Sequence, residues 1–149
     1  MNLILFGFKG VGKTFQGRKM SVELGRCFYD TDEMIEDQHK KSVREIFQQY
    51  GEEKFRKIEK EILIQLKGVT NSIIAVGGGT VLDSENVSFL QGLGELIYLK
   101  TGFETILERI LTNGIPSFVD VKNPVESLKI LYETRCQIFD TIPARVMNV

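Results

Sequence analysis

Near the start of the chain, glycines are followed by a lysine and a threonine in the stretch Gly7-Phe8-Lys9-Gly10-Val11-Gly12-Lys13-Thr14. Gly7 and Gly12-Lys13-Thr14 match the pattern G-x-x-x-x-G-K-[ST], in which the backbone N–H groups of a loop surround a phosphate. In this pattern the lysine reaches the β- and γ-phosphates, and the threonine hydroxyl can ligate Mg²⁺. The stretch therefore predicts a binding site for a nucleoside triphosphate.

Further along the chain, three groups of residues have the chemistry of an acceptor site: Asp30 with Asp32, the triplet Gly77-Gly78-Gly79, and Arg56 with Glu59. An aspartate beside a triphosphate can orient a hydroxyl nucleophile or hold metal-bound water. Successive glycines let backbone N–H groups approach a small substrate closely, and an arginine offers two parallel donors to a carboxylate. These groups predict an acceptor site next to the phosphates.

The elements that would position these groups alternate between strands and helices. Short apolar runs predict strands over 2–6, 26–29, 72–76, 96–99 and 145–149. Helices are expected over about 13–24, 84–91, 101–112 and 124–139. The stretch after Asp32 is expected to be helical in two pieces, one that begins at the capping-box pattern of Ser42 and Glu45 and one that follows the break at Gly51.

This alternation predicts one α/β domain over residues 1–149, with a parallel sheet and helices on both faces. Ligands of such sheets bind beyond the carboxyl ends of the strands, where the groups above converge. A formal net charge of −1 gives no basic excess for nucleic-acid binding. No apolar run is long enough for a membrane span, and the expected location is the cytoplasm.

The segments GFKGVGKT, FYDTD, SVREIF, GEEKFRKIE, AVGGGTV and LYETR resemble shikimate kinases in their order and spacing. This family belongs to the nucleoside monophosphate kinase branch of P-loop folds. The resemblance covers nearly the whole chain and implies a three-layer fold with sheet order 2-3-1-4-5 and a mobile lid. It also implies transfer of the γ-phosphoryl group of MgATP to the 3-hydroxyl of shikimate, a step of chorismate and aromatic amino acid biosynthesis.

The resemblance also implies residue roles. The ATP phosphates would be bound by Lys13 and by the loop residues Gly7, Lys9, Gly10, Val11 and Gly12. The adenine would lie against Arg109. Mg²⁺ would be held by Thr14 with Asp30 or Asp32. Asp32 would bind shikimate hydroxyls and act as the catalytic base. The remaining shikimate contacts would come from Arg56 and Arg135 at the carboxylate, Gly77, Gly78 and Gly79 along the ring, and Phe47 and Phe55 as walls.

The sequence departs from the family pattern in two places. Ile115-Pro116-Ser117 stands where family lids carry an Arg-Pro-Leu-like stretch, and an arginine of this kind contributes about 10³–10⁵ in rate. Lys9 is a candidate substitute for that charge. The family also continues beyond the last strand with an adenine-binding loop and a final helix, whereas this sequence ends at Val149. The resemblance implies a monomer, and a dimer is the alternative that would cover the sheet.

Two other functions remain open at this stage. One is phosphorylation of another small hydroxy acid, such as gluconate. The other is a weakly active or inactive relative that acts as a ligand-binding module, which the isoleucine at position 115 and the end at Val149 would favour. A motor or a signalling GTPase is disfavoured, because no second strand ends in a separate Walker-B aspartate followed by switch-like loops.

Overall fold

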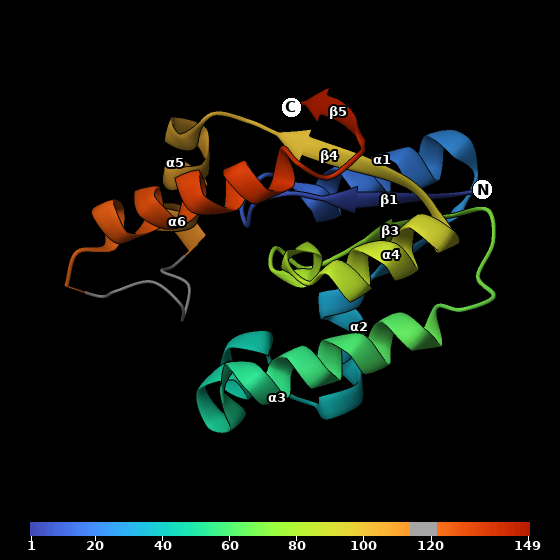
Figure 1. The fold of residues 1–149 in the computed structure, drawn as a ribbon, viewed down its shortest axis with the longest axis horizontal. Coiled ribbons are helices and arrows are strands. Elements are labelled where there is room, and N and C mark those ends of the chain that lie inside the picture. Colours follow the sequence, from blue (N-terminus) through green and yellow to red (C-terminus); the bar gives the residue numbers. More distant parts are fainter. Residues whose placement is uncertain (114–121) are drawn as a thin grey trace.

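A parallel sheet of five strands forms the centre of the computed structural model, which describes residues 1–113 and 122–149 (Figure 1). The strand order is β2-β3-β1-β4-β5, as predicted. The strands are β1 (Asn2–Phe6), β2 (Cys27–Asp30), β3 (Ser72–Ala75), β4 (Gly94–Lys100) and β5 (Arg145–Asn148). The central strand β1 pairs Leu5 with Ala75 on one side and with Ile97 on the other. Its unbroken apolar run suits a strand that is covered on both faces.

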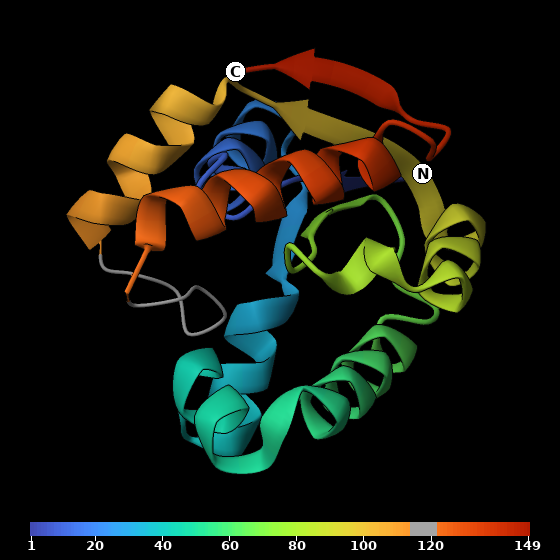
Figure 2. The same cartoon turned by 60° about the vertical axis from the view of Figure 1, so that its left-hand side comes forward.

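Helices cover both faces of the sheet, so the expected three-layer architecture is confirmed (Figure 2). On one face, α1 (Lys13–Leu24) packs over a core of five buried residues, Leu5, Val11, Ile73, Ile97 and Leu99. The opposite face carries the larger core, to which α4 (Ser84–Leu93), α5 (Phe103–Asn113) and α6 (Pro124–Phe139) contribute. Phe6, Tyr98 and Phe139 stack and pack edge-on in its middle.

A helical arm extends from the β2 side of the sheet (Figure 1). It consists of α2 (Thr31–His39) and α3 (Val43–Gln65), which share a small apolar core that includes Ile35, Ile46 and Ile58. The arm continues directly from β2, and the end of α3 joins the main core through Leu63. A 3₁₀ turn, η1 (Thr80–Leu82), follows β3 and lies between this arm and α6.

The sequence misplaced some local features. It did not predict α2, and it ended the second strand at residue 29, whereas Asp30 ends β2 and accepts a hydrogen bond from the Glu33 N–H at 3.2 Å as the cap of α2.

Other local predictions are confirmed. Ser42 and Glu45 form the capping box of α3, and Gly51 breaks the helix with φ 82° and ψ 172°. In addition, Gly17 of α1 is buried against Phe28 of β2. Within residues 1–113 and 122–149, no helix is long and apolar enough to cross a membrane.

Candidate active site

The loop between β1 and α1 is held in shape by the lysine at its end. Lys13 Nζ donates to the carbonyl oxygens of Gly7 at 2.9 Å and Phe8 at 3.2 Å. Gly12, with φ 98°, occupies a conformation that side chains disfavour, directly before the first turn of α1. The loop therefore presents backbone N–H groups and a positive helix end next to an ammonium group, which is an arrangement for binding phosphate.

Arg109 reaches this loop from α5. Its Nη1 donates to the carbonyl oxygens of Gly10 and Val11, both at 3.0 Å. The guanidinium group thus supplies a hydrogen-bond donor to two carbonyls of the loop and ties α5 to it. The position beside the loop is compatible with the predicted adenine contact, which stays a prediction.

A hydroxyl and a carboxylate meet at the start of α1. Thr14 Oγ1 donates to Asp30 Oδ2 at 2.7 Å, so the end of β2 and the phosphate-binding loop are joined. Asp30 therefore both caps α2 and contacts the phosphate-binding loop. Oxygen donors of this kind suit Mg²⁺, which binds through one or two protein groups together with substrate phosphates. In the described part of the chain there is no cluster of three or more His, Cys, Asp or Glu residues able to hold a metal by themselves.

Asp32 and Lys13 form the electrostatic centre of the site. Burial, together with the nearby carboxylates of Asp30 and Glu59, raises the pKa of Asp32 to about 6, against the opposing influence of the Lys13 ammonium. Removal from water lowers the pKa of Lys13 to about 8, against the opposing influence of Asp32 and Asp30. A carboxylate with a pKa near neutrality is suited to exchange protons with a substrate.

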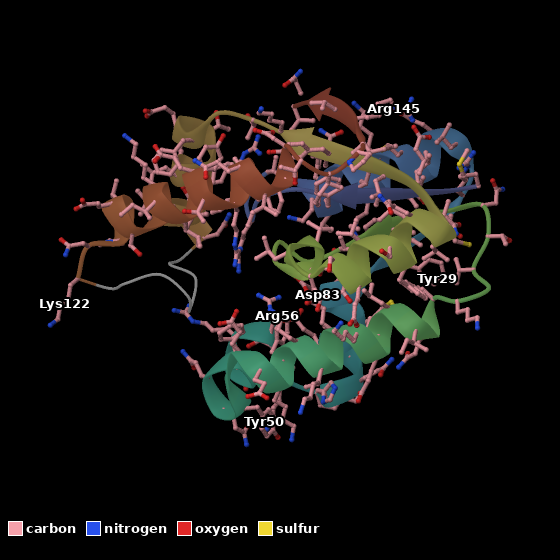
Figure 3. All side chains as sticks on the ribbon, viewed as in Figure 1. Tyr29, Tyr50, Arg56, Asp83, Lys122 and Arg145 are labelled. Atoms are coloured by element: carbon pink, nitrogen blue, oxygen red, sulfur yellow. The ribbon has the colours of Figure 1, made fainter. Side chains whose placement is uncertain are left out.

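The arm contributes Arg56, which is directed from α3 toward the segment around η1 (Figure 3). Its Nη1 donates to Glu59 Oε1 at 3.0 Å, and Glu59 itself is only 1% exposed. The glycine triplet lies directly against these groups. A Cβ on Gly79 would lie 2.3 Å from Arg56 Nη2, and a Cβ on Gly77 would lie 2.9 Å from Asp32 Oδ1.

Arg135 and three aromatic rings complete the surroundings. Arg135, on α6, is 8% exposed, its guanidinium lies 5.9 Å from the centre of the Phe8 ring, and burial together with nearby Arg56 lowers its pKa. An arginine remains cationic even so. Phe47 and Phe55 of α3 contact each other with ring centres 5.4 Å apart.

These groups line one cavity of about 640 Å³. All predicted site residues are in its wall except Gly7 and Val11, which are buried. Glu59 had no predicted role, and several other residues of the wall were not predicted: Glu33, Glu36, Val43, Arg44, Ile110 and Asn113. The i, i+3 spacing of Arg56 and Glu59 was the available signal for the first, but no motif marked the others. Ile115-Pro116-Ser117, and with it the predicted absence of a lid arginine, lies outside the described residues.

A phosphate-binding loop after the central strand, facing carboxylates and arginines across one cavity, defines a P-loop kinase. The family model for shikimate kinase matches residues 9–149. The chain belongs to the shikimate kinase family.

Individual relatives agree with this assignment. A shikimate kinase of Caldanaerobacter subterraneus subsp. tengcongensis is 40% identical over 134 residues, which are 90% of this chain and 78% of that protein. A shikimate kinase of Thermus thermophilus is 39% identical over 136 residues, which are 91% of this chain and 74% of that protein. Among solved structures, shikimate kinase from Acinetobacter baumannii in complex with shikimate superposes with a TM-score of 0.91 at 31% identity, covering 99% of this chain and 83% of that one.

Proposed function

We propose that this chain transfers the γ-phosphoryl group of MgATP to the 3-hydroxyl of shikimate, in aromatic amino acid biosynthesis. The observation that carries the proposal is that one cavity is lined by Lys13 and its loop, by Asp32, and by the two arginines Arg56 and Arg135. This arrangement suits a nucleotide at one end and a small carboxylated alcohol at the other. Family membership and the named relatives support the same substrate pair.

At the nucleotide end, Lys13 and the loop amides would bind the β- and γ-phosphates. The hydrogen bonds from Lys13 to Gly7 and Phe8 already fix the ammonium group in place, so little ordering remains when the phosphates arrive. Thr14 and Asp30 would hold Mg²⁺, which when bound neutralises phosphate charge. Arg109 would contact adenine while it supports the loop.

Asp32 would act as the general base. Its carboxylate would accept the proton of the substrate hydroxyl as that oxygen bonds to the γ-phosphorus, while the bond from phosphorus to the β,γ-bridging oxygen breaks and ADP leaves. A pKa of about 6 leaves Asp32 ionised at neutral pH yet basic enough to take the proton. The neighbouring ammonium of Lys13 would balance the charge that develops on the phosphates.

At the acceptor end, Arg56 and Arg135 would bind the shikimate carboxylate. They approach from different elements, α3 and α6, so a carboxylate between them would join the arm to the body of the protein. Gly77, Gly78 and Gly79 would lie along the ring, and Phe47 and Phe55 would cover its apolar side.

ADP formation with MgATP tests the proposal, measured with shikimate, with gluconate and with no acceptor. We expect ADP only with shikimate, and its loss in Lys13→Ala, because the β- and γ-phosphates lose their cation. ADP formation with gluconate in place of shikimate would contradict the substrate assignment. A shikimate-induced rise in melting temperature without any ADP would contradict catalysis and favour a ligand-binding module.

The proposal also covers oligomeric state and location. By resemblance we propose a monomer that acts in the cytoplasm. Sedimentation velocity at micromolar concentration tests the first point, and a dimer there would favour the alternative in which a second copy covers part of the sheet.

A further inference from the structure

Glu59 is a buried carboxylate that Arg56 alone does not satisfy. Its Oε1 accepts from Arg56 Nη1 at 3.0 Å, and its Oε2 accepts from Thr80 Oγ1 at 2.8 Å. Glu59 is 1% exposed and Thr80 is 0% exposed. Burying a carboxylate that lacks a hydrogen-bond donor costs free energy. The Thr80 hydroxyl therefore fixes the position of Glu59, and Glu59 in turn fixes the position of Arg56.

Thr80 is itself held firmly. Its N–H donates to the carbonyl oxygen of Gly77 at 3.1 Å, and its own carbonyl oxygen accepts from Asn86 Nδ2 at 2.9 Å. Asn86 is 4% exposed and lies in the first turn of α4, whose cap is Asp83. The backbone of Thr80 is therefore anchored outside the arm, to Gly77 and to α4, while its hydroxyl reaches Glu59 on the arm.

The glycine triplet leaves the space for this contact. A Cβ on Gly77 would lie 3.2 Å from Thr80 Oγ1 and 3.3 Å from Glu59 Oε2, so a side chain there would press on both. The Thr80 hydroxyl and the Glu59 carboxylate can meet because the residue at position 77 has no side chain.

We propose that Thr80 is a positioning residue for the acceptor site. Through Glu59 it fixes the position of Arg56, on the arm, relative to the sheet and the helices that cover it. Thr80 is not expected to contact substrate. If the Thr80 hydroxyl were removed, Arg56 would keep its charge but would no longer be held in a fixed position. The kinetic part of this inference rests on the proposed function.

Thr80→Val tests the inference because it removes the hydroxyl and keeps the shape of the side chain. Thr80→Ser keeps the hydroxyl. Thr31→Val is a matched control, since Thr31 is also 0% exposed and its Oγ1 has no hydrogen-bond partner among the described residues. Near-UV circular dichroism would verify that each variant is folded.

The first measurement needs no substrate. In nitrogen-15 NMR spectra of the ligand-free protein, the Nη–H signals of Arg56, assigned by their loss in Arg56→Lys, report how slowly the guanidinium rotates. We expect slow rotation in the wild type, Thr80→Ser and Thr31→Val, and fast rotation in Thr80→Val. Slow rotation in Thr80→Val would overturn the inference whatever the substrate is.

The second measurement is the KM for shikimate. Loss of one hydrogen bond to a charged group corresponds to about a tenfold rise for Thr80→Val. The kcat is expected to change by less than about threefold, because the substrate carboxylate is bound alike in ground and transition states. A KM for Thr80→Val equal to that of Thr31→Val would overturn the inference. If the wild type leaves shikimate unphosphorylated, the proposed function fails and the NMR result decides this inference alone.

Discussion

Substituting Gly79 with alanine should weaken acceptor binding without straining the fold. Gly79 has φ −102° and ψ −3°, a negative-φ conformation that residues other than glycine also adopt in turns, so the backbone itself tolerates the change. The added Cβ, however, would lie 2.3 Å from Arg56 Nη2 and 2.7 Å from its Cζ, whereas ordinary contacts begin at 3.4 Å. The guanidinium therefore has to retreat by about 1 Å, a displacement large enough to matter at a binding site.

The retreat disturbs the contacts that hold Arg56. Its Nη1 lies 3.0 Å from Glu59 Oε1 and its Nη2 lies 3.6 Å from Glu52 Oε1. Loss of one well-placed hydrogen bond to the substrate carboxylate costs about 2 kcal/mol, which corresponds to about a 30-fold rise in the KM for shikimate. The kcat is expected to fall much less, because Arg56 is remote from the reacting hydroxyl in the proposed arrangement.

Initial rates of ADP formation at varied shikimate concentration measure this effect. Gly92→Ala is the matched control, because a Cβ at that exposed position in α4 meets nothing within 4 Å. The control should keep the wild-type KM and gain slight stability from the better helix former. A KM for Gly79→Ala within about twofold of the control would refute the reasoning, since a displaced Arg56 could not then bind the carboxylate so well.

The remaining predictions concern pH, stability and nucleotide binding. The kcat/KM for shikimate should rise with pH through about 6 as Asp32 loses its proton, and fall above about 8 as Lys13 loses its charge; a flat profile from pH 5 to 9 would contradict both roles. Asn2→Ala should lower the free energy of unfolding in urea by about 3 kcal/mol, because the buried amide bonds Val69, Leu93 and Ser72 at 2.7 to 2.9 Å; a loss under about 1 kcal/mol would argue against this. Arg109→Met should raise the KM for ATP about tenfold and leave that for shikimate unchanged, because two loop carbonyls lose their donor; equal effects on both substrates would count against it.

The sequence predicted the sheet and the phosphate-binding loop well, because their signals are local and strong. Five short apolar runs and the glycine-lysine-threonine pattern need no tertiary information, and the family resemblance supplied the strand order. The break at Gly51 was also predicted correctly, because it depends only on the backbone conformation of that one residue.

The sequence missed α2, although the pair Asp30 and Glu33 has the spacing of a helix start. The predicted helical stretch was not extended back to Asp30, which in the structure is both the cap of α2 and the partner of Thr14. Capping and ligand chemistry use the same oxygen atoms, so a residue pattern cannot separate them.

Thr80 shows the other limit of the sequence. Its hydroxyl contacts Glu59 across 21 positions of the chain, and no spacing rule connects a 3₁₀ turn with the interior of a helix. Arg56 and Glu59, by contrast, are neighbours on one helix and were noticed together. Long-range polar contacts of this kind became visible only in the structure.

Direct detection of the phosphorylated product tests the central claim most directly. Phosphorus-31 and proton NMR of a reaction with MgATP and shikimate should show ADP and, in equal amount, a phosphate ester coupled to the proton on carbon 3 of the ring. Lys13→Ala should yield neither. Hydrolysis of ATP to ADP and inorganic phosphate without the ester, or no reaction by a folded protein, would contradict the account.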